Sequence, residues 1–98
     1  MANVRFEWDS KKATANLKKH RISFEEATTV FFDENGLLVN DPDHSLYEER
    51  FILMGFSDHL RIIVVSHSYK VNDQIIRIIS ARKATKKEQR QYHKRWEQ

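Results

Sequence analysis

Apolar and charged residues alternate at the start of the chain, from Val4 to Trp8. This period of two predicts a half-buried strand. Asp9 follows the strand and can cap a helix, which we expect to run to about His20.

A second helix is predicted from a capping box, in which Ser23 is the cap and Glu26 stands three residues further on. The apolar residues behind it share one face, so we expect a helix over residues 23–33. Asn35-Gly36 is a strong turn signal and ends this region.

Beyond that turn the sequence predicts four strands, over residues 37–39, 50–57, 60–69 and 74–82. The last two carry consecutive Ile and Val residues and are therefore apolar on both faces. We expect them to be central strands, with helices covering much of the sheet on each side.

The last element opens with a second capping box, formed by Thr85 and Glu88. At helical spacing, Tyr92 and Trp96 share one side, and we expect them to dock this helix on the sheet. A basic stripe lies roughly opposite and consists of Lys86, Arg90 and Lys94, with Lys83 and Lys87 flanking it. The predicted order is β-α-α-β-β-β-β-α, which makes the fold class α+β with a mainly antiparallel sheet packed with helices.

The composition is typical of one small globular domain spanning residues 1–98. The chain has no cysteine, which excludes disulfides, thiolate metal sites and a cysteine nucleophile. For a small domain this favours the reducing cytosol, so we expect a cytoplasmic protein. No apolar run approaches the length of a membrane span, and the N-terminus lacks the apolar stretch of a signal peptide.

Positive charge is concentrated at the C-terminal end. Residues 82–98 hold seven basic and two acidic side chains, whereas the rest of the chain holds ten basic and twelve acidic ones. This split predicts a polyanion or an acidic protein as partner, although a solvated helix face has the same composition.

Few catalytic motifs are present. The two glycines stand apart, so no phosphate-binding loop exists, and no serine sits in a nucleophile elbow. Asp41, Asp43 and His44 could hold a divalent ion, but the pattern is common by chance, and we expect neither a metal nor a cofactor.

Two polar residues interrupt the apolar central strands, His67 and Arg77. A buried guanidinium is unfavourable unless paired, so Arg77 either pairs with an acid (Glu7, Glu48 or Glu49) or faces a cleft. The two residues share a sheet face if residue 70 lies opposite 74, and diverge if it lies opposite 73.

Arg82 and Lys83 end the last strand at the start of the capped helix, where two cations would make an anion site. Strand-borne His and Arg fit RNA cleavage by the RNA's own 2′-hydroxyl. That reaction needs orientation, proton transfer and stabilisation of a charged phosphorane.

Several short sequence motifs, occurring in this order, resemble those of the BrnT-type toxins. They are Phe6-Glu7-Trp8-Asp9, Asn16-Leu17-Lys18-Lys19-His20, Ser23-Phe24-Glu25-Glu26-Ala27, Asp41-Pro42-Asp43-His44, Glu49-Arg50-Phe51, Gly55, Arg77-Ile78-Ile79-Ser80-Ala81-Arg82-Lys83-Ala84, Glu88 and Tyr92. The resemblance covers nearly the whole chain, from about residue 5 to about residue 93. Ser10, Arg21 and residues 70–74 depart from the usual pattern.

The resemblance implies a RelE-like fold and the activity of a metal-independent endoribonuclease in a type II toxin–antitoxin module. It also implies a BrnA-like ribbon-helix-helix antitoxin, which neutralises the toxin and carries the complex to operator DNA. Arg50, Arg77, Arg82 and Lys83 match recurrent basic residues of the family, and His67 and Tyr92 fall at polar or aromatic positions.

The predicted site follows from these matches. Arg77 and Arg82 are expected to hold the scissile phosphate, Lys83 to assist it, and His67 to act as acid or base, with Tyr92 a weaker candidate. The helix residues Lys86, Lys87, Arg90 and Lys94 are expected to bind nucleic acid. The alternative is a non-catalytic module that binds nucleic acid or an antitoxin.

Overall fold

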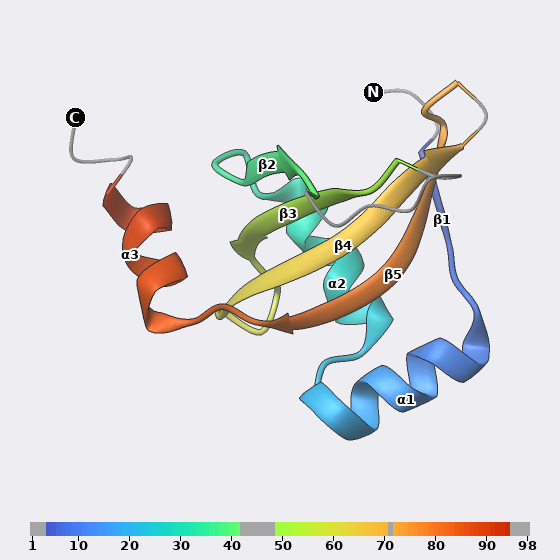
Figure 1. Cartoon of the computed structure of the whole chain (residues 1–98), viewed down its shortest axis with the longest axis horizontal. Helices are drawn as coiled ribbons and strands as arrows, with labels where there is room; N and C mark the ends of the chain where they lie inside the picture. The colour runs from blue at the N-terminus through green and yellow to red at the C-terminus, as the bar shows by residue number, and fades with distance from the viewer. Residues whose placement is uncertain (1–3, 42–48, 71, 95–98) are drawn as a thin grey trace.

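A five-stranded sheet in the order β1-β5-β4-β3-β2 forms the centre of the molecule (Figure 1). The computed structural model describes residues 4–41, 49–70 and 72–94. The strands are β1 (Arg5–Glu7), β2 (Leu37–Asn40), β3 (Phe51–Phe56), β4 (Ile62–Lys70) and β5 (Ile75–Lys83). β1 runs parallel to β5, and the other neighbours are antiparallel. The α+β class, the mainly antiparallel sheet and the interior position of the two most apolar strands are confirmed.

The helices are α1 (Ser10–His20), α2 (Phe24–Thr29) and α3 (Lys86–Lys94), and a 3-10 turn (Val30–Phe32) follows α2. The position predicted for the helix over 23–33 is therefore correct, but its last turn is a 3-10 turn and not α-helix. Helix α1 is capped at its C-terminal end by Arg21, which itself adopts the left-handed conformation (φ 60°) that glycine usually supplies. Within the described part of the chain, no helix has the length and apolar content needed to cross a membrane.

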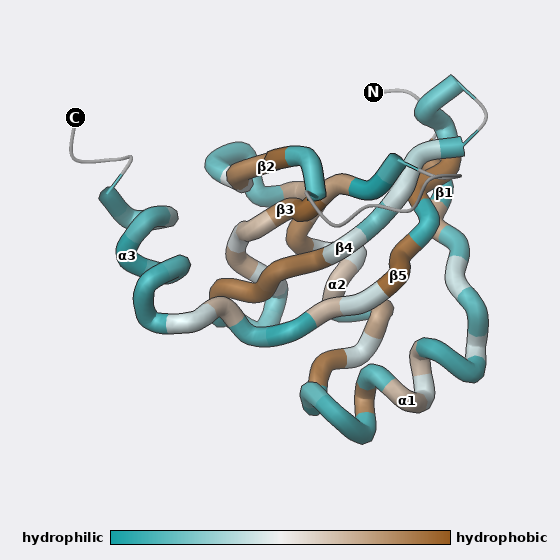
Figure 2. The backbone as a smooth tube through the Cα atoms, in the orientation of Figure 1, coloured by the Kyte–Doolittle hydropathy of each residue, from teal (hydrophilic) through white to brown (hydrophobic). Residues whose placement is uncertain are grey.

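The two faces of the sheet are covered unequally. Helices α1 and α2 pack on one face around a core that contains Phe24, Val65 and Ile78, and α2 lies behind the sheet in Figure 1. On the other face a smaller cluster joins Val64 to Tyr92 of α3. The most hydrophobic segments lie in the sheet, whereas α3 is hydrophilic along most of its length (Figure 2). The prediction that helices cover much of both faces is confirmed for the first face. On the second face α3 covers only a part of the sheet, around Val64.

Helix α1 completes the edge of β5 that β1 leaves open. β1 pairs with β5 only as far as Arg77, so Ala81 has no strand on that side. The buried side chain of Asn16 takes the strand's place, since its Oδ1 accepts from Ala81 N at 3.1 Å and its Nδ2 donates to Ala81 O at 2.9 Å. This amide also donates to Ile22 O at 3.0 Å. A buried asparagine with these partners is satisfied and fixes α1 against the sheet.

Helix α3 is attached through the carboxyl group of Asp33. Its Oδ2 accepts from the Tyr92 hydroxyl at 2.6 Å and from Phe56 N at 2.9 Å, and its Oδ1 accepts from Asn35 N at 3.0 Å. A Cβ at Gly55 would lie 2.9 Å from Asp33 Oδ2, so only glycine allows this approach. One carboxyl group therefore joins the turn before β2, the end of β3 and the buried face of α3.

We expect Tyr92→Phe to lower the free energy of unfolding by about 1–3 kcal/mol, because it removes a buried hydrogen-bond donor and leaves an acceptor behind. Urea denaturation followed by circular dichroism measures the change. Asp33→Asn combined with Tyr92→Phe should cost less than the sum of the single variants, because both act on one contact. Fully additive losses would contradict this account of α3 docking.

Candidate functional site

Arg77 and Arg82 lie on the face of the sheet that α3 partly covers. Their neighbours on β5, Ile78 and Ala81, point into the core beneath α1 and α2, so the two arginines point the other way. At about 3.3 Å per residue their Cα atoms are roughly 15 Å apart. The arrangement therefore fits two groups along an extended ligand better than a single phosphate.

Arg77 has an acidic neighbour and also remains partly exposed. Its Nη1 lies 3.7 Å from Oε2 of Glu7, which also binds Lys70 Nζ at 3.0 Å. About a third of the Arg77 side chain is exposed. The sequence left open an ion pair or an open face, and the structure provides both, with Glu7 as the acid; Glu48 lies outside the described residues.

Arg50 belongs to the same row of side chains. It directly precedes β3, whose register pairs Phe51 with His67, so the next position brings Arg50 opposite Ser68. Ser68 in turn pairs with Arg77. The row Arg50, Ser68 and Arg77 thus crosses three neighbouring strands on one face.

His67 lies on the opposite face, so it does not converge with Arg77. Lys70 pairs with Ile75 and His67 with Ile78, which matches neither of the two registers considered from sequence. A β-bulge at Ser66/His67 separates the two halves of the ladder.

The ring of His67 is fully buried and internally satisfied. Its Nδ1 lies 3.2 Å from Val65 O, which can only accept, so Nδ1 carries the proton and Nε2 accepts from the Tyr69 hydroxyl at 3.1 Å. The ring also packs edge-on against Phe31 at 4.8 Å. Burial lowers the pKa of His67, which keeps the ring neutral.

Tyr92 is also buried, and its hydroxyl is bound to Asp33. Its ring packs edge-on against Phe56 at 5.5 Å, which confirms its predicted docking role; Trp96 lies outside the described residues. The roles of His67 and Tyr92 as acid or base stay predictions, and the burial of both side chains does not support them.

Arg82 is bound to Glu88 within the predicted capping box. Its Nη1 and Nη2 donate to the two carboxylate oxygens at 2.8 and 2.9 Å, while the same carboxylate accepts from Thr85 N at 2.8 Å. The hydrogen bonds from Arg82 are the main reason that the pKa of Glu88 falls to about 2. Lys83, by contrast, is exposed and has no ion-pair partner among the described residues.

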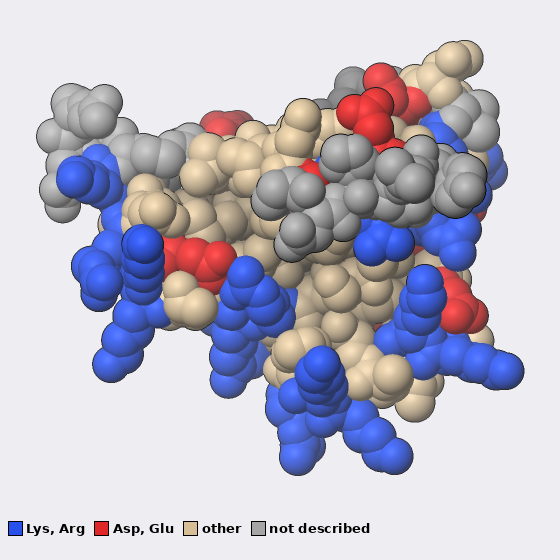
Figure 3. Space-filling model, viewed as in Figure 1, with Lys and Arg blue, Asp and Glu red and all other residues tan. Residues whose placement is uncertain are grey.

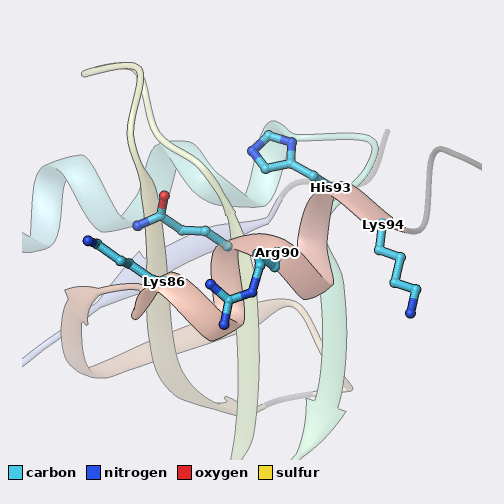
Figure 4. Close-up of a pocket in the computed structure, with 5 residues that line it drawn as sticks. Lys86, Arg90, His93 and Lys94 are labelled. Atoms are coloured by element: carbon cyan, nitrogen blue, oxygen red, sulfur yellow. The ribbon is translucent and has the colours of Figure 1, made fainter.

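The basic stripe on α3 is confirmed as one surface. Its members, Lys86, Arg90 and Lys94, line an open pocket of about 500 Å³ together with Gln89 and His93 (Figure 4). All of these side chains are exposed, as is that of Lys87 beside the pocket.

Positive charge also extends further than the C-terminal helix. Lys and Arg side chains line the lower edge of the face in Figure 3, from α3 past the end of the sheet to α1. The contribution of α1 comes from Lys11, Lys12, Lys18 and Lys19, which the sequence analysis did not assign to a site. Their signal was visible as four lysines in one short helix.

A second feature could not be predicted from the sequence. Lys83 lines a cleft of about 270 Å³ between α3 and the turn that joins β3 to β4. The only sequence signal was Leu60, an apolar residue in a turn where polar residues are usual. Among the described residues, no three His, Asp or Glu side chains gather closely enough to hold a metal ion; Asp43 and His44 lie outside them.

Comparisons with known proteins agree on one family. The model for "Ribonuclease toxin, BrnT, of type II toxin-antitoxin system" matches residues 8–88. Among solved structures, the Brucella abortus ribonuclease toxin BrnT superposes with a TM-score of 0.61 and 22% sequence identity. The match covers 85% of this chain and 99% of that one, and shows a shared fold. No curated protein matches the chain significantly.

The Arg82–Glu88 pair predicts a specific pH dependence. Because folding lowers the pKa of Glu88 from 4.5 to about 2, the pair stabilises the fold fully above pH 4.5, and this stabilisation is lost as the pH falls towards 2. The difference in unfolding free energy between the wild type and Glu88→Gln should therefore shrink between pH 5 and pH 2. Urea denaturation at a series of pH values measures it. Glu25→Gln, which changes an exposed glutamate of α2, is the control; a pH-independent difference for Glu88→Gln would contradict the assignment.

Proposed function

The chain belongs to the BrnT family, the ribonuclease toxins of type II toxin–antitoxin systems, and we propose that it is an endoribonuclease that cuts RNA without a metal ion. The observation that carries this proposal is the row of Arg50, Ser68 and Arg77 on the sheet face that α3 partly covers, continued on the same face by Arg82 and then by the basic stripe of α3. Ser68 is buried, so an RNA strand on this face would contact the partly exposed side chains of Arg77 and Arg82 before it reaches the stripe.

In the proposed reaction the RNA supplies its own nucleophile. The 2′-hydroxyl loses its proton to solvent and attacks the adjacent phosphorus, the bond to the 5′-oxygen breaks, and the leaving 5′-oxygen takes up a proton from solvent. The products are a 2′,3′-cyclic phosphate and a 5′-hydroxyl end. The protein orients the backbone and stabilises the charge that gathers on the phosphorane oxygens. Arg77 fits this role because a guanidinium presents paired donors to phosphate. Arg82 and Lys83 lie five and six residues further along β5, so they contact phosphates further along the RNA strand, and the role of Lys83 at the leaving oxygen expected from sequence is not supported by its position.

Arg77 and Arg82 act here from ion pairs rather than as free cations. Arg77 lies 3.7 Å from Glu7, a loose contact that a phosphate can replace. Arg82 makes a bidentate hydrogen-bonded ion pair with Glu88, which orients its guanidinium before RNA binds. Arg77 is therefore the stronger candidate for direct contact with the scissile phosphate.

The basic stripe gives the proposed enzyme its hold on the RNA outside the scissile bond. Lys86, Arg90 and Lys94 are spaced one helical turn apart and are exposed, with Lys87 beside them. Such a row contacts successive phosphates and carries little sequence information.

We further propose that a BrnA-like ribbon-helix-helix antitoxin neutralises the toxin by covering α3, and that the complex reaches operator DNA through the antitoxin. A partner with acidic side chains would displace RNA from the stripe by both occupancy and charge.

A non-catalytic binding module is the second candidate, favoured by the burial of His67 and Tyr92 and the pairing of both arginines. Inducible expression without antitoxin separates the two proposals, because only the enzyme arrests growth while the protein stays folded. Normal growth with soluble, folded protein would support the binding module.

Arg77→Ala should lower RNA cleavage by at least about 100-fold, because it removes a transition-state contact to phosphate. Cleavage of a defined single-stranded RNA by purified protein is followed in excess EDTA, and Arg77→Lys should recover only part of the rate. Arg5→Ala, which removes an exposed arginine of β1, is the matched control. Strict dependence on added metal, or full activity of folded Arg77→Ala, would overturn the mechanism.

Changing Lys86, Arg90 and Lys94 together to Gln should weaken RNA binding at low salt and flatten its salt dependence. Three lost phosphate contacts to single-stranded RNA should reduce the slope of log K against log salt by about 2. Fluorescence anisotropy with a labelled RNA measures this slope. The same charge change on α1, at Lys11, Lys12 and Lys19, should leave the slope closer to that of the wild type. Equal effects of the two triple variants would mean that α3 is not the preferred contact.

A further inference from the structure

The cleft beside Lys83 is lined by apolar, aromatic and basic side chains. It lies between the turn that joins β3 to β4 and the start of α3. Phe56 and Leu60 line it from the turn side, and Lys83, Gln89 and His93 line it from the other side. Its volume of about 270 Å³ is near the lower limit for small-molecule pockets, so it holds one ring system rather than a larger ligand.

Leu60 combines an unfavourable backbone conformation with an apolar side chain that is exposed to solvent. Ser57 N donates to Arg61 O, so the turn is a three-residue hairpin loop with Leu60 as its last residue. Leu60 has φ 59°, the left-handed conformation for which glycine is preferred at this place. Its side chain is 84% exposed and gains little from burial. A leucine that helps neither the turn nor the core is best explained by contact with a ligand.

The turn that holds Leu60 is rigid because it is tied to α2. The buried carboxylate of Glu26 accepts from Arg61 Nε at 2.8 Å and from the Ser57 hydroxyl at 2.6 Å. Thr29 Oγ1 accepts from Asp58 N at 2.9 Å. These contacts fix both ends of the loop, so Leu60 is presented in one place before any ligand arrives.

The two cations that line the cleft, Arg61 and Lys83, differ in whether they are paired with an acid. Arg61 is neutralised by Glu26, which it meets through two nitrogens, whereas Lys83 has no ion-pair partner among the described residues. Gln89 donates its Nε2 hydrogen to Ala84 O at 3.1 Å, which orients its Oε1 as an acceptor. The cleft therefore offers one free cation and one oriented acceptor next to apolar surface.

The aromatic part of the cleft comes from Phe56. Its ring is 37% exposed and is held edge-on by the rings of Tyr92 at 5.5 Å and His93 at 6.1 Å. A fixed and partly exposed aromatic ring is a surface on which a nucleobase can stack.

We propose that this cleft binds one unstacked nucleobase of the RNA substrate, with the adjoining phosphate on Lys83. Leu60 and Phe56 contact the base from the turn side, and Gln89 Oε1 accepts from its exocyclic amino group, which favours adenine, cytosine or guanine over uracil. The inference rests on the proposed function and adds a subsite that selects the base next to the cut.

Leu60→Gly is the decisive variant, because it removes the contact while relieving the backbone. Its thermal midpoint should equal or exceed that of the wild type. Its affinity for single-stranded RNA should fall about five- to tenfold, at the lower end of the range for loss of one base contact. Leu38→Ala, which shortens an exposed leucine of β2 outside the cleft, is the control and should leave RNA affinity unchanged.

The readout uses RNA oligonucleotides that carry 2′-O-methyl groups and therefore cannot be cut, each with a single 2-aminopurine. Scanned along the sequence, one position should brighten on binding the wild type as that base leaves its stack, and should stay quenched with Leu60→Gly. Gln89→Leu should reduce the preference for bases with an exocyclic amino group in cleavage assays.

Two results would overturn the subsite. One is unchanged RNA affinity and fluorescence in Leu60→Gly. The other is weaker binding of purified antitoxin with RNA binding intact, which would assign Leu60 to a protein interface. If the wild type neither binds nor cuts RNA, the proposed function itself fails; if the wild type cuts RNA and Leu60→Gly matches it in every assay, only the subsite fails.

Discussion

The carboxyl group of Asp33 is the contact on which the functional face depends. It accepts hydrogen bonds from the end of β3 and from the hydroxyl of Tyr92. Because Tyr92 is the buried residue of α3, this contact sets where the exposed basic residues of that helix lie relative to the sheet. Gly55 allows the contact by leaving space that a side chain would fill. A basic helix with little apolar surface is thus held by the ring and hydroxyl of Tyr92, together with the Arg82–Glu88 ion pair and the Gln89–Ala84 hydrogen bond, while its basic stripe stays exposed.

Local signals in the sequence predicted the elements well, and long-range signals did so less completely. The capping box of Thr85 and Glu88 forms as expected, with both reciprocal hydrogen bonds. In the box of Ser23 and Glu26, the hydrogen bond from Glu26 N to Ser23 Oγ forms, but the Glu26 carboxylate binds Arg61 and not the backbone of Ser23. No local pattern reports a partner 35 residues away.

The candidate site shows the same limit. Counting odd and even positions could not place His67 relative to Arg77, because the bulge shifts the register between β4 and β5 partway along the ladder. The basic stripe of α3 was predictable because it depends only on helical spacing. Leu60 was not, because its meaning comes from a left-handed backbone and high exposure, and neither can be read from composition.

The parallel pairing of β1 with β5 has a consequence for how the protein comes into being. Arg5 lies beside Ile75, and the Asn16 amide beside Ala81, so β1 and α1 find these partners only after β5, some 65 to 70 residues later in the chain, has been made. Contacts this distant in sequence slow folding and form late. Assembly of the sheet on which the arginines lie is therefore tied to synthesis of β5. A chain broken off before β5 lacks both Arg77 and the strand with which β1 pairs, so an incomplete copy cannot form the face on which the arginines lie.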